Sequence, residues 1–185
     1  MLQDLSQYVL DIAENSLKAG ATEVKIELSV DDKKDLVSLI VEDNGPGMDE
    51  ELLKMVADPF CTTRQERRVG LGIPFLKQAA EASEGFLRID STKGKGTKVE
   101  ASFRKSHIDC PPTGDLASTL VALVVGWPDR DLVFRYVVNG RTLELSTHQL
   151  LEVLEDRNFF VLPEVAMWLK KYLNEQIEKL HTGRK

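Results

Sequence analysis

Three polar residues near the start of the chain have a spacing that would let them act together. Asp11, Asn15 and Lys18 recur at four- and three-residue steps, which places them on one face of a predicted helix. The carboxylate can orient or deprotonate a water, the amide oxygen can ligate Mg²⁺, and the ammonium can meet a phosphate. By itself, the spacing fits an ordinary solvated helix face better than a binding site.

Two glycine clusters offer further chemistry. The segment Asp43-Asn44-Gly45-Pro46-Gly47-Met48 follows a predicted buried strand, where a carboxylate can accept a hydrogen bond from an exocyclic amine such as that of adenine. Its glycines permit a flat ring to approach the backbone. Arg68-Val69-Gly70-Leu71-Gly72 precedes a helix, where backbone amides can bind an anion. Neither Arg68–Gly72 nor Lys93–Thr97 has the spacing of a Walker A loop. Each of the two glycine clusters, taken alone, is also compatible with a simple turn.

Alternating and helical patterns predict the elements that position these residues. Residues 23–30 alternate between apolar and polar side chains, which is typical of a half-buried strand. The predicted order is helix, two strands, two helices and two strands, with antiparallel neighbours. This order predicts an α/β two-layer sandwich: a mixed, mostly antiparallel sheet with helices on one face. The predicted helices span 3–19, 49–57 and 73–84, and the strands 23–30, 36–41, 86–89 and 97–103.

Cys110-Pro111-Pro112 predicts a boundary, with one domain at 1–108 and a small α+β extension at 109–185. In the extension we predict helices at 116–125 and 148–155, a hairpin turning at Asn139-Gly140, and a final helix at 163–180. The apolar face of the final helix includes Trp168, and both Trp168 and Trp127 are predicted to pack in the core or between domains.

The composition excludes several classes of function. The 185 residues carry a net charge of −6, so no basic surface favours a nucleic-acid partner. No apolar run approaches the roughly 20 residues of a membrane-spanning helix, and the N-terminus lacks a secretory signal pattern. The two cysteines form no CxxC pair, which indicates reduced thiols and a cytoplasmic location.

Five segments, in this order, resemble the GHKL (histidine-kinase-like, or Bergerat-fold) ATPase superfamily over residues 1 to about 105. Asp11–Ala21 resembles the N box, Asp43–Met48 the G1 box, and Asp58–Arg64 the F box with its lid. Val69–Gly85 resembles the G2 box with its helix, and Lys93–Phe103 the last box with its strand. Sensor histidine kinases, anti-sigma kinases and mismatch-repair ATPases belong to this superfamily.

The resemblance implies a Mg-ATP pocket. Asn15 would ligate Mg²⁺ through its amide oxygen, Lys18 would meet a phosphate, and Asp43 would bind the adenine amine. Asp11 falls where many members carry a glutamate as general base, and it is one methylene shorter. The remaining implied contacts are Gly45, Gly47 and Met48 at the base, Phe60, Thr62, Thr63 and Arg64 in the lid, Gly70, Leu71 and Gly72 at the phosphates, and Thr97 supporting Asp43 through a water.

The resemblance leaves three functions open. None of His107, His148 and His181 is followed by an acidic residue, and the predicted ATP domain begins at residue 1, so we expect no phosphoacceptor histidine. We favour a stand-alone bacterial ATP-dependent regulator of a protein partner. The alternatives are a kinase that acts in trans on a separate protein, and a slow ATPase. The expected partners are ATP and a protein, without nucleic acid or membrane, and a homodimer is open.

Overall fold

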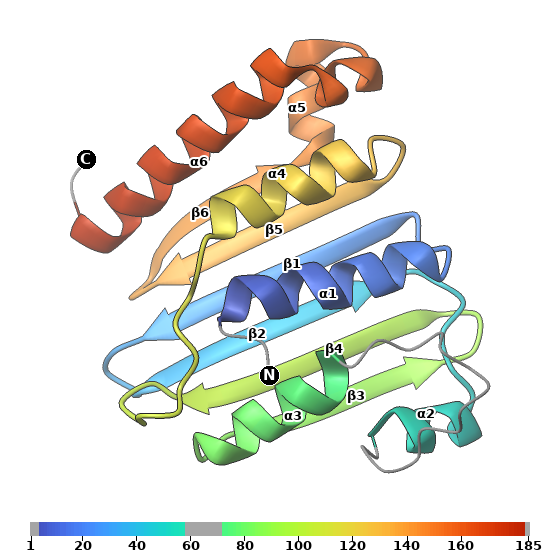
Figure 1. Cartoon of the computed structure of the whole chain (residues 1–185), viewed down its shortest axis with the longest axis vertical. Helices are drawn as coiled ribbons and strands as arrows, with labels where there is room; N and C mark the ends of the chain where they lie inside the picture. Colours follow the sequence, from blue (N-terminus) through green and yellow to red (C-terminus); the bar gives the residue numbers. More distant parts are fainter. Residues whose placement is uncertain (1–3, 58–71, 184–185) are drawn as a thin grey trace.

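The computed structural model describes residues 4–57 and 72–183, which form a two-layer α/β structure around one mixed six-stranded sheet (Figure 1). The strand order is β3-β4-β2-β1-β5-β6. All neighbouring strands are antiparallel except β1 and β5, which run parallel. This arrangement confirms the predicted fold class. The strands are β1 (Glu23–Asp31), β2 (Leu36–Asp43), β3 (Phe86–Thr92), β4 (Gly96–Arg104), β5 (Asp131–Val138) and β6 (Arg141–Ser146).

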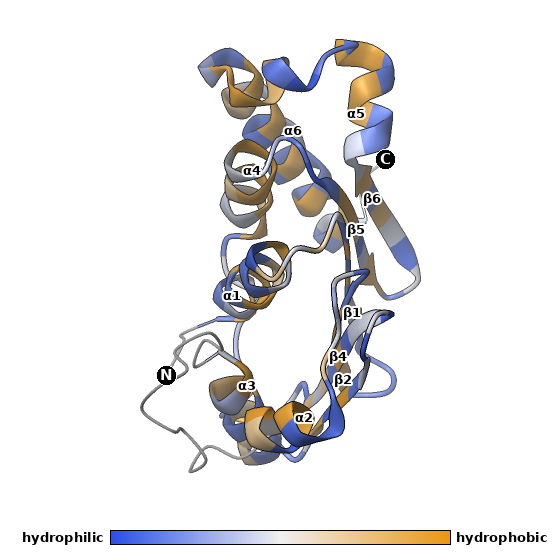
Figure 2. Ribbon diagram, turned by 90° about the vertical axis from the view of Figure 1, so that its right-hand side faces the viewer, coloured by the Kyte–Doolittle hydropathy of each residue, from blue (hydrophilic) through white to orange (hydrophobic). Residues whose placement is uncertain are grey.

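Helices α1, α3, α4 and α6 cover one face of the sheet (Figures 1 and 2). The predicted helices all form, with ends that differ by a few residues at most, as is usual where helices fray. No helix in the described parts of the chain is both long enough and apolar enough to cross a membrane. The helices are α1 (Leu5–Lys18), α2 (Glu50–Ala57), α3 (Gly72–Ala82), α4 (Leu116–Gly126), α5 (Thr147–Leu154) and α6 (Pro163–Thr182), with a short 3-10 helix η1 (Arg157–Val161).

The core lies between this helical layer and the sheet. The alternation in β1 places four apolar side chains on the helix-covered face, all buried. Helix α1 contributes a matching stripe, and its start is fixed by Asp4, whose carboxylate accepts a hydrogen bond from the Gln7 amide at 3.0 Å. The stripe residues in β1 and α1 are Val24, Ile26, Leu28, Val30, Leu5, Tyr8, Val9, Ile12, Ala13 and Leu17.

The C-terminal half continues the same sheet. Strand β5 pairs with β1 from Glu23–Asp131 to Val30–Val138. The predicted hairpin between β5 and β6 forms, and its two turn residues, Asn139 and Gly140, have positive φ (50° and 82°), as a tight hairpin turn requires. The predicted boundary at residue 108 therefore falls between two parts of one continuous sheet. The division into two domains stays a prediction.

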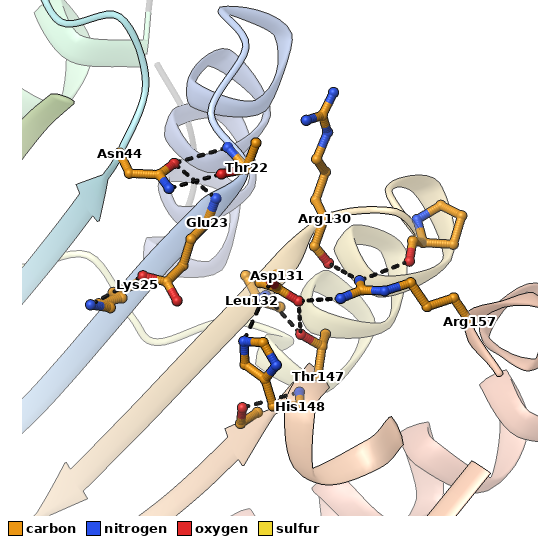
Figure 3. A network of polar contacts seen from close by, with 12 residues as sticks. Thr22, Glu23, Lys25, Asn44, Arg130, Asp131, Leu132, Thr147, His148 and Arg157 are labelled. Carbon is orange, nitrogen blue, oxygen red and sulfur yellow. Dashed lines mark hydrogen bonds and ion pairs between the residues drawn. The ribbon is translucent and has the colours of Figure 1, made fainter. Parts of the chain in front are cut away.

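A polar network centred on Asp131 ties the last elements to the start of β5 (Figure 3). Asp131 Oδ1 accepts hydrogen bonds from Arg157 Nη2 at 2.6 Å and from Thr147 Oγ1 at 3.3 Å. Arg157 Nη1 also donates to the carbonyls of Pro128 and Arg130, at 3.2 and 3.1 Å. The network joins α5 and η1 to the sheet through hydrogen bonds that involve a charged group, which are stronger than neutral ones.

The prediction that Trp168 packs in the core is wrong. Its side chain is 53% exposed, and Tyr172, one turn later, is 37% exposed. Leu169 and Leu173 on the same helix are buried, and Trp127 is partly buried against the core. The apolar stripe of α6 is wider than the surface that covers it, because α4, η1 and the last strands contact only part of the helix.

Candidate functional site

The carboxylate of Asp43, at the end of β2, is held by two donors from different segments. Ser16 of α1 donates its hydroxyl proton to Oδ2 at 2.6 Å, and the Gly45 amide donates to Oδ1 at 2.8 Å. Together they fix the orientation of a half-buried acid beside α1. Ser16 was not among the predicted site residues. The signal that could have identified Ser16 is a hydroxyl side chain on the otherwise apolar face of the first helix.

The turn after Asp43 is fastened to the start of β1 (Figure 3). Asn44 Oδ1 accepts hydrogen bonds from the amides of Thr22 and Glu23, both at 2.9 Å, and Asn44 Nδ2 donates to Thr22 Oγ1 at 2.8 Å. Gly45 is buried in this turn, and a Cβ there would lie 2.9 Å from Asp43 Oδ1. The turn therefore has little room for a side chain next to the held carboxylate.

A second hydrogen-bonded group lies across from Asp43, on β3 and β4. The Met48 amide donates to Ser91 Oγ at 2.8 Å, and Ser91 Oγ lies 2.9 Å from Thr97 Oγ1. Thr97 is the direct neighbour of Asp43 in the β2–β4 register. Ser91 was also missed, because an isolated strand serine carries no distinctive pattern. The water-mediated support of Asp43 by Thr97 stays a prediction.

A cavity of about 320 Å³ opens at this end of the strands. Its volume lies at the lower end of the range for small-molecule sites. Apolar side chains and both signs of charge line it, so a ligand with a flat apolar part and polar edges would find suitable contacts. The lining residues are Glu42, Asp43, Leu53, Ile89, Asp90, Ser91, Thr92, Lys95, Gly96, Thr97 and Lys98.

The polar face of α1 meets the start of α3. Asn15 Nδ2 donates to Asp11 Oδ2 at 3.3 Å, and a Cβ at Gly72 would lie 1.8 Å from the same oxygen. With a Cβ at residue 72, the Asp11 side chain would have to move away from the start of α3. Tyr8 supports the contact, since its hydroxyl donates to the Phe75 carbonyl at 3.3 Å. Burial raises the pKa of the Tyr8 phenol, which therefore stays protonated near neutral pH.

The structure thus brings Asp11, Asn15 and Gly72 together, and Ser16 connects this group to Asp43. Lys18 instead forms an exposed ion pair with Glu14 on α1, so its contact with a phosphate stays a prediction. The predicted contacts Phe60, Thr62, Thr63, Arg64, Gly70 and Leu71 lie outside the described residues.

Within residues 4–57 and 72–183, no three His, Cys, Asp or Glu side chains gather where they could hold a metal ion. A Mg²⁺ ion bound with phosphates needs fewer protein ligands, because phosphate oxygens and waters complete its shell. An Asn15 amide oxygen fits that role.

Residues 2–107 match the family of histidine kinase-, DNA gyrase B- and HSP90-like ATPases, which is more than half of the chain. The chain belongs to this family. Its match to that family identifies residues 2–107 as a nucleotide-binding ATPase domain. The resemblance drawn from the five sequence segments is confirmed.

Curated relatives share this domain. A putative sensor protein of Shewanella frigidimarina is 32% identical over 111 residues, which are 58% of this chain and 17% of that protein. Sporulation kinase A of Bacillus subtilis is 28% identical over 101 residues, which are 55% of this chain and 16% of the kinase. The chain therefore spans less than a fifth of the length of these relatives.

A solved structure shares the fold over more of the chain. The N-terminal domain of a DNA repair protein aligns with a TM-score of 0.54 at 16% identity, covering 78% of this chain and 53% of that one. This coverage exceeds residues 2–107, so the shared fold extends into the C-terminal half.

The geometry around Gly47 yields a stability prediction. Gly47 and Gly94 both have positive φ (63° and 80°), but a Cβ at Gly47 would lie 2.1 Å from the Thr92 carbonyl oxygen, whereas nothing lies within 4 Å at Gly94. Gly47→Ala should therefore destabilise the protein by about 2 kcal/mol more than Gly94→Ala, because only the former forces the backbone apart. Urea unfolding followed by circular dichroism measures both. Equal losses of unfolding free energy in the two variants would show that the strain of positive φ, and not the contact with Thr92, causes the destabilisation.

Proposed function

We propose that this chain binds Mg-ATP at the end of β2 and uses the nucleotide state to regulate a protein partner, without a phosphoacceptor histidine of its own. The orientation of Asp43 is the observation that carries the proposal. Ser16 and Gly45 each occupy one carboxylate oxygen, which leaves further lone pairs for a planar amine donor. A carboxylate held from two sides before the ligand arrives loses little freedom on binding.

The phosphates would lie toward α1 and α3. Because Asn15 Nδ2 is engaged by Asp11, the amide oxygen of Asn15 is the atom free to ligate Mg²⁺. The start of α3 at Gly72 adds the positive end of a helix dipole, which favours an anion. Lys18 and the predicted lid residues would complete the contacts.

Asp11 is the candidate general base. Its carboxylate lies beside the amide of Asn15, the proposed Mg²⁺ ligand. A water bound near that ion would therefore lie within reach of the Asp11 or the Asn15 side chain. Its one missing methylene, compared with glutamate, favours slow turnover. A bound nucleotide that is cleaved slowly suits a regulator.

Hydrogen bonds connect the proposed pocket to the C-terminal half, which supports a regulatory role. Asn44, next to Asp43, binds the Thr22 amide, and the Thr22 carbonyl accepts a hydrogen bond from the Asp131 amide at 2.8 Å. Asp131 in turn holds Arg157 and Thr147 at the last helices (Figure 3). A shift of the turn at Asn44 would therefore reach α5 and η1 through direct contacts.

We expect Asp43→Asn to weaken ATP binding about a hundredfold, because a charged acceptor of the base amine becomes an amide. Ser16→Ala should weaken it about fivefold, since the carboxylate loses one of its two holders. Isothermal titration calorimetry measures both, with the exposed Asp129→Asn as control. An unchanged ATP affinity of Asp43→Asn would contradict the assignment of the pocket to Asp43.

Asn15→Ala should abolish the Mg²⁺ dependence of ATP binding, because the substitution removes the amide ligand. In the unchanged protein, chelation of Mg²⁺ should weaken ATP binding about tenfold or more. The measurement is the ATP affinity of both proteins with Mg²⁺ and with EDTA. The exposed Asn174→Ala serves as control. An equal response of Asn15→Ala and the unchanged protein to EDTA would assign the metal ligand elsewhere.

The regulatory role has its own test. Hydrogen exchange should slow on ATP binding at the start of β5 and in α5, and Asn44→Ala should reduce this effect while the pocket still binds ATP. In parallel, γ-labelled ATP distinguishes the alternatives: release of labelled phosphate indicates the slow ATPase, and label on a second protein indicates a kinase. Slower hydrogen exchange confined to the pocket residues would contradict the regulatory role.

A further inference from the structure

Exposed apolar side chains cluster at the C-terminal end of the chain. Of the nine large hydrophobic residues exposed in the described ranges, seven lie between residues 153 and 172. Val153 is 79% exposed, and the Trp168 indole is 53% exposed. Apolar clusters of this kind on a folded protein mark interaction surfaces. The seven are Val153, Phe159, Val161, Leu162, Met167, Trp168 and Tyr172.

A groove of about 420 Å³ lies within this cluster, between α5 and α6. Its walls are apolar apart from a single carboxylate, Glu164. Trp168, which lines the groove, stacks on Tyr172 with ring centroids 5.5 Å apart and planes inclined by 12°, and this contact supports the indole ring. Helices α5 and α6 lie at the β6 end of the sheet (Figure 1). The cavity next to Asp43 is lined mainly by residues of β3 and β4, at the opposite end of the strand order. The groove's lining residues are Leu150, Val153, Leu154, Glu164, Val165 and Trp168.

The charged side chains along α6 indicate which partner would fit this groove. Glu164, Trp168 and Lys171 are spaced by four and three residues, so they share one side of the helix. Within the described residues, neither Glu164 nor Lys171 forms an ion pair with its own chain. The acid and the base flank the tryptophan at nearly equal distances along the helix. Two such helices in antiparallel orientation, centred on Trp168, would place each Lys171 opposite the Glu164 of the other copy.

We propose that the groove between α5 and α6 binds helix α6 of a second copy of this chain, about a twofold axis near Trp168. The surface is self-complementary, as a twofold interface requires, because one stripe carries the apolar centre and both members of the ion pair. The pairing would cover Val153 and Trp168 of both copies. A large aromatic residue at the centre of an interface is typical of a binding hot spot. The residues that line this groove are different from those that line the cavity next to Asp43.

The first test is the mass of the full chain in solution. Sedimentation velocity from roughly 1 to 100 µM should show a rise from 20.8 kDa to twice that mass. Trp168→Ala should weaken the dimer about tenfold or more, because the central contact is lost. Ile108→Ala is the control for the loss of an exposed apolar side chain: Ile108 is 94% exposed and lies between β4 and α4, outside α6.

The second test is a charge exchange. Lys171→Glu and Glu164→Lys should each weaken the dimer, because each places like charges opposite one another across the twofold axis. The double variant Glu164→Lys with Lys171→Glu restores opposite charges and should recover the dimer. Lys170→Glu makes the same charge change as Lys171→Glu on another side of α6 and should leave dimerisation unchanged. Circular dichroism checks that every variant is folded.

Three outcomes would overturn the proposal. A 20.8 kDa species at every concentration would show that a second copy does not occupy the groove. A dimer insensitive to Trp168→Ala would place the interface elsewhere. A double charge variant no stronger than the two single variants would exclude the antiparallel pairing.

Discussion

The parallel pairing of β1 with β5 is the contact on which the rest of this structure depends. It joins residues 23–30 to residues 131–138, so the strands of the family domain and the C-terminal hairpin become one sheet. Parallel neighbours require a long crossover, and here the crossover carries β2, the helices α2 to α4 and the β3–β4 hairpin. Without that pairing, α4 and α6 would have no sheet to cover, and β1 would be an edge strand. The helical layer is continuous because the sheet beneath it is continuous.

The start of the same strand connects the proposed pocket to the C-terminal half. The start of β1 accepts the turn after Asp43 through Thr22 and Glu23, and it receives the start of β5 through the Thr22 carbonyl. Asn44 and Asp131 therefore belong to one hydrogen-bonded arrangement, although Asn44 follows Asp43 at the proposed pocket and Asp131 anchors the last helices. Short polar side chains at strand ends make this possible, because they bind neighbouring backbone groups without crossing the core.

The two faces of the sheet have different roles. The helix-covered face is apolar, whereas charged side chains follow one another across the open face. In the strand register, Glu100 lies beside Arg88, and Arg135 pairs with both Glu27 and Glu144. Opposite charges at neighbouring positions stabilise adjacent strands and keep this face hydrated. The apolar cluster around α5 and α6 stands out against such a surface, which is why it points to an interface.

Local patterns in the sequence determined most of the elements, because alternation and helical spacing report directly which side chains face the core. The pattern around Asp11, Asn15 and Asp43 also determined the family, since its glycines and polar residues recur in a specific order. Tertiary structure alone decided the partners of those residues. Ser16 bonds Asp43 only because α1 packs beside β2, and Gly72 lies close to the Asp11 carboxylate only because α3 begins beside α1. Likewise, Trp168 belongs to an apolar stripe by sequence, yet it is exposed because the elements beneath α6 are too narrow to cover it. A periodic pattern states which side of an element is apolar, but only packing against the other elements decides how much of that side is covered.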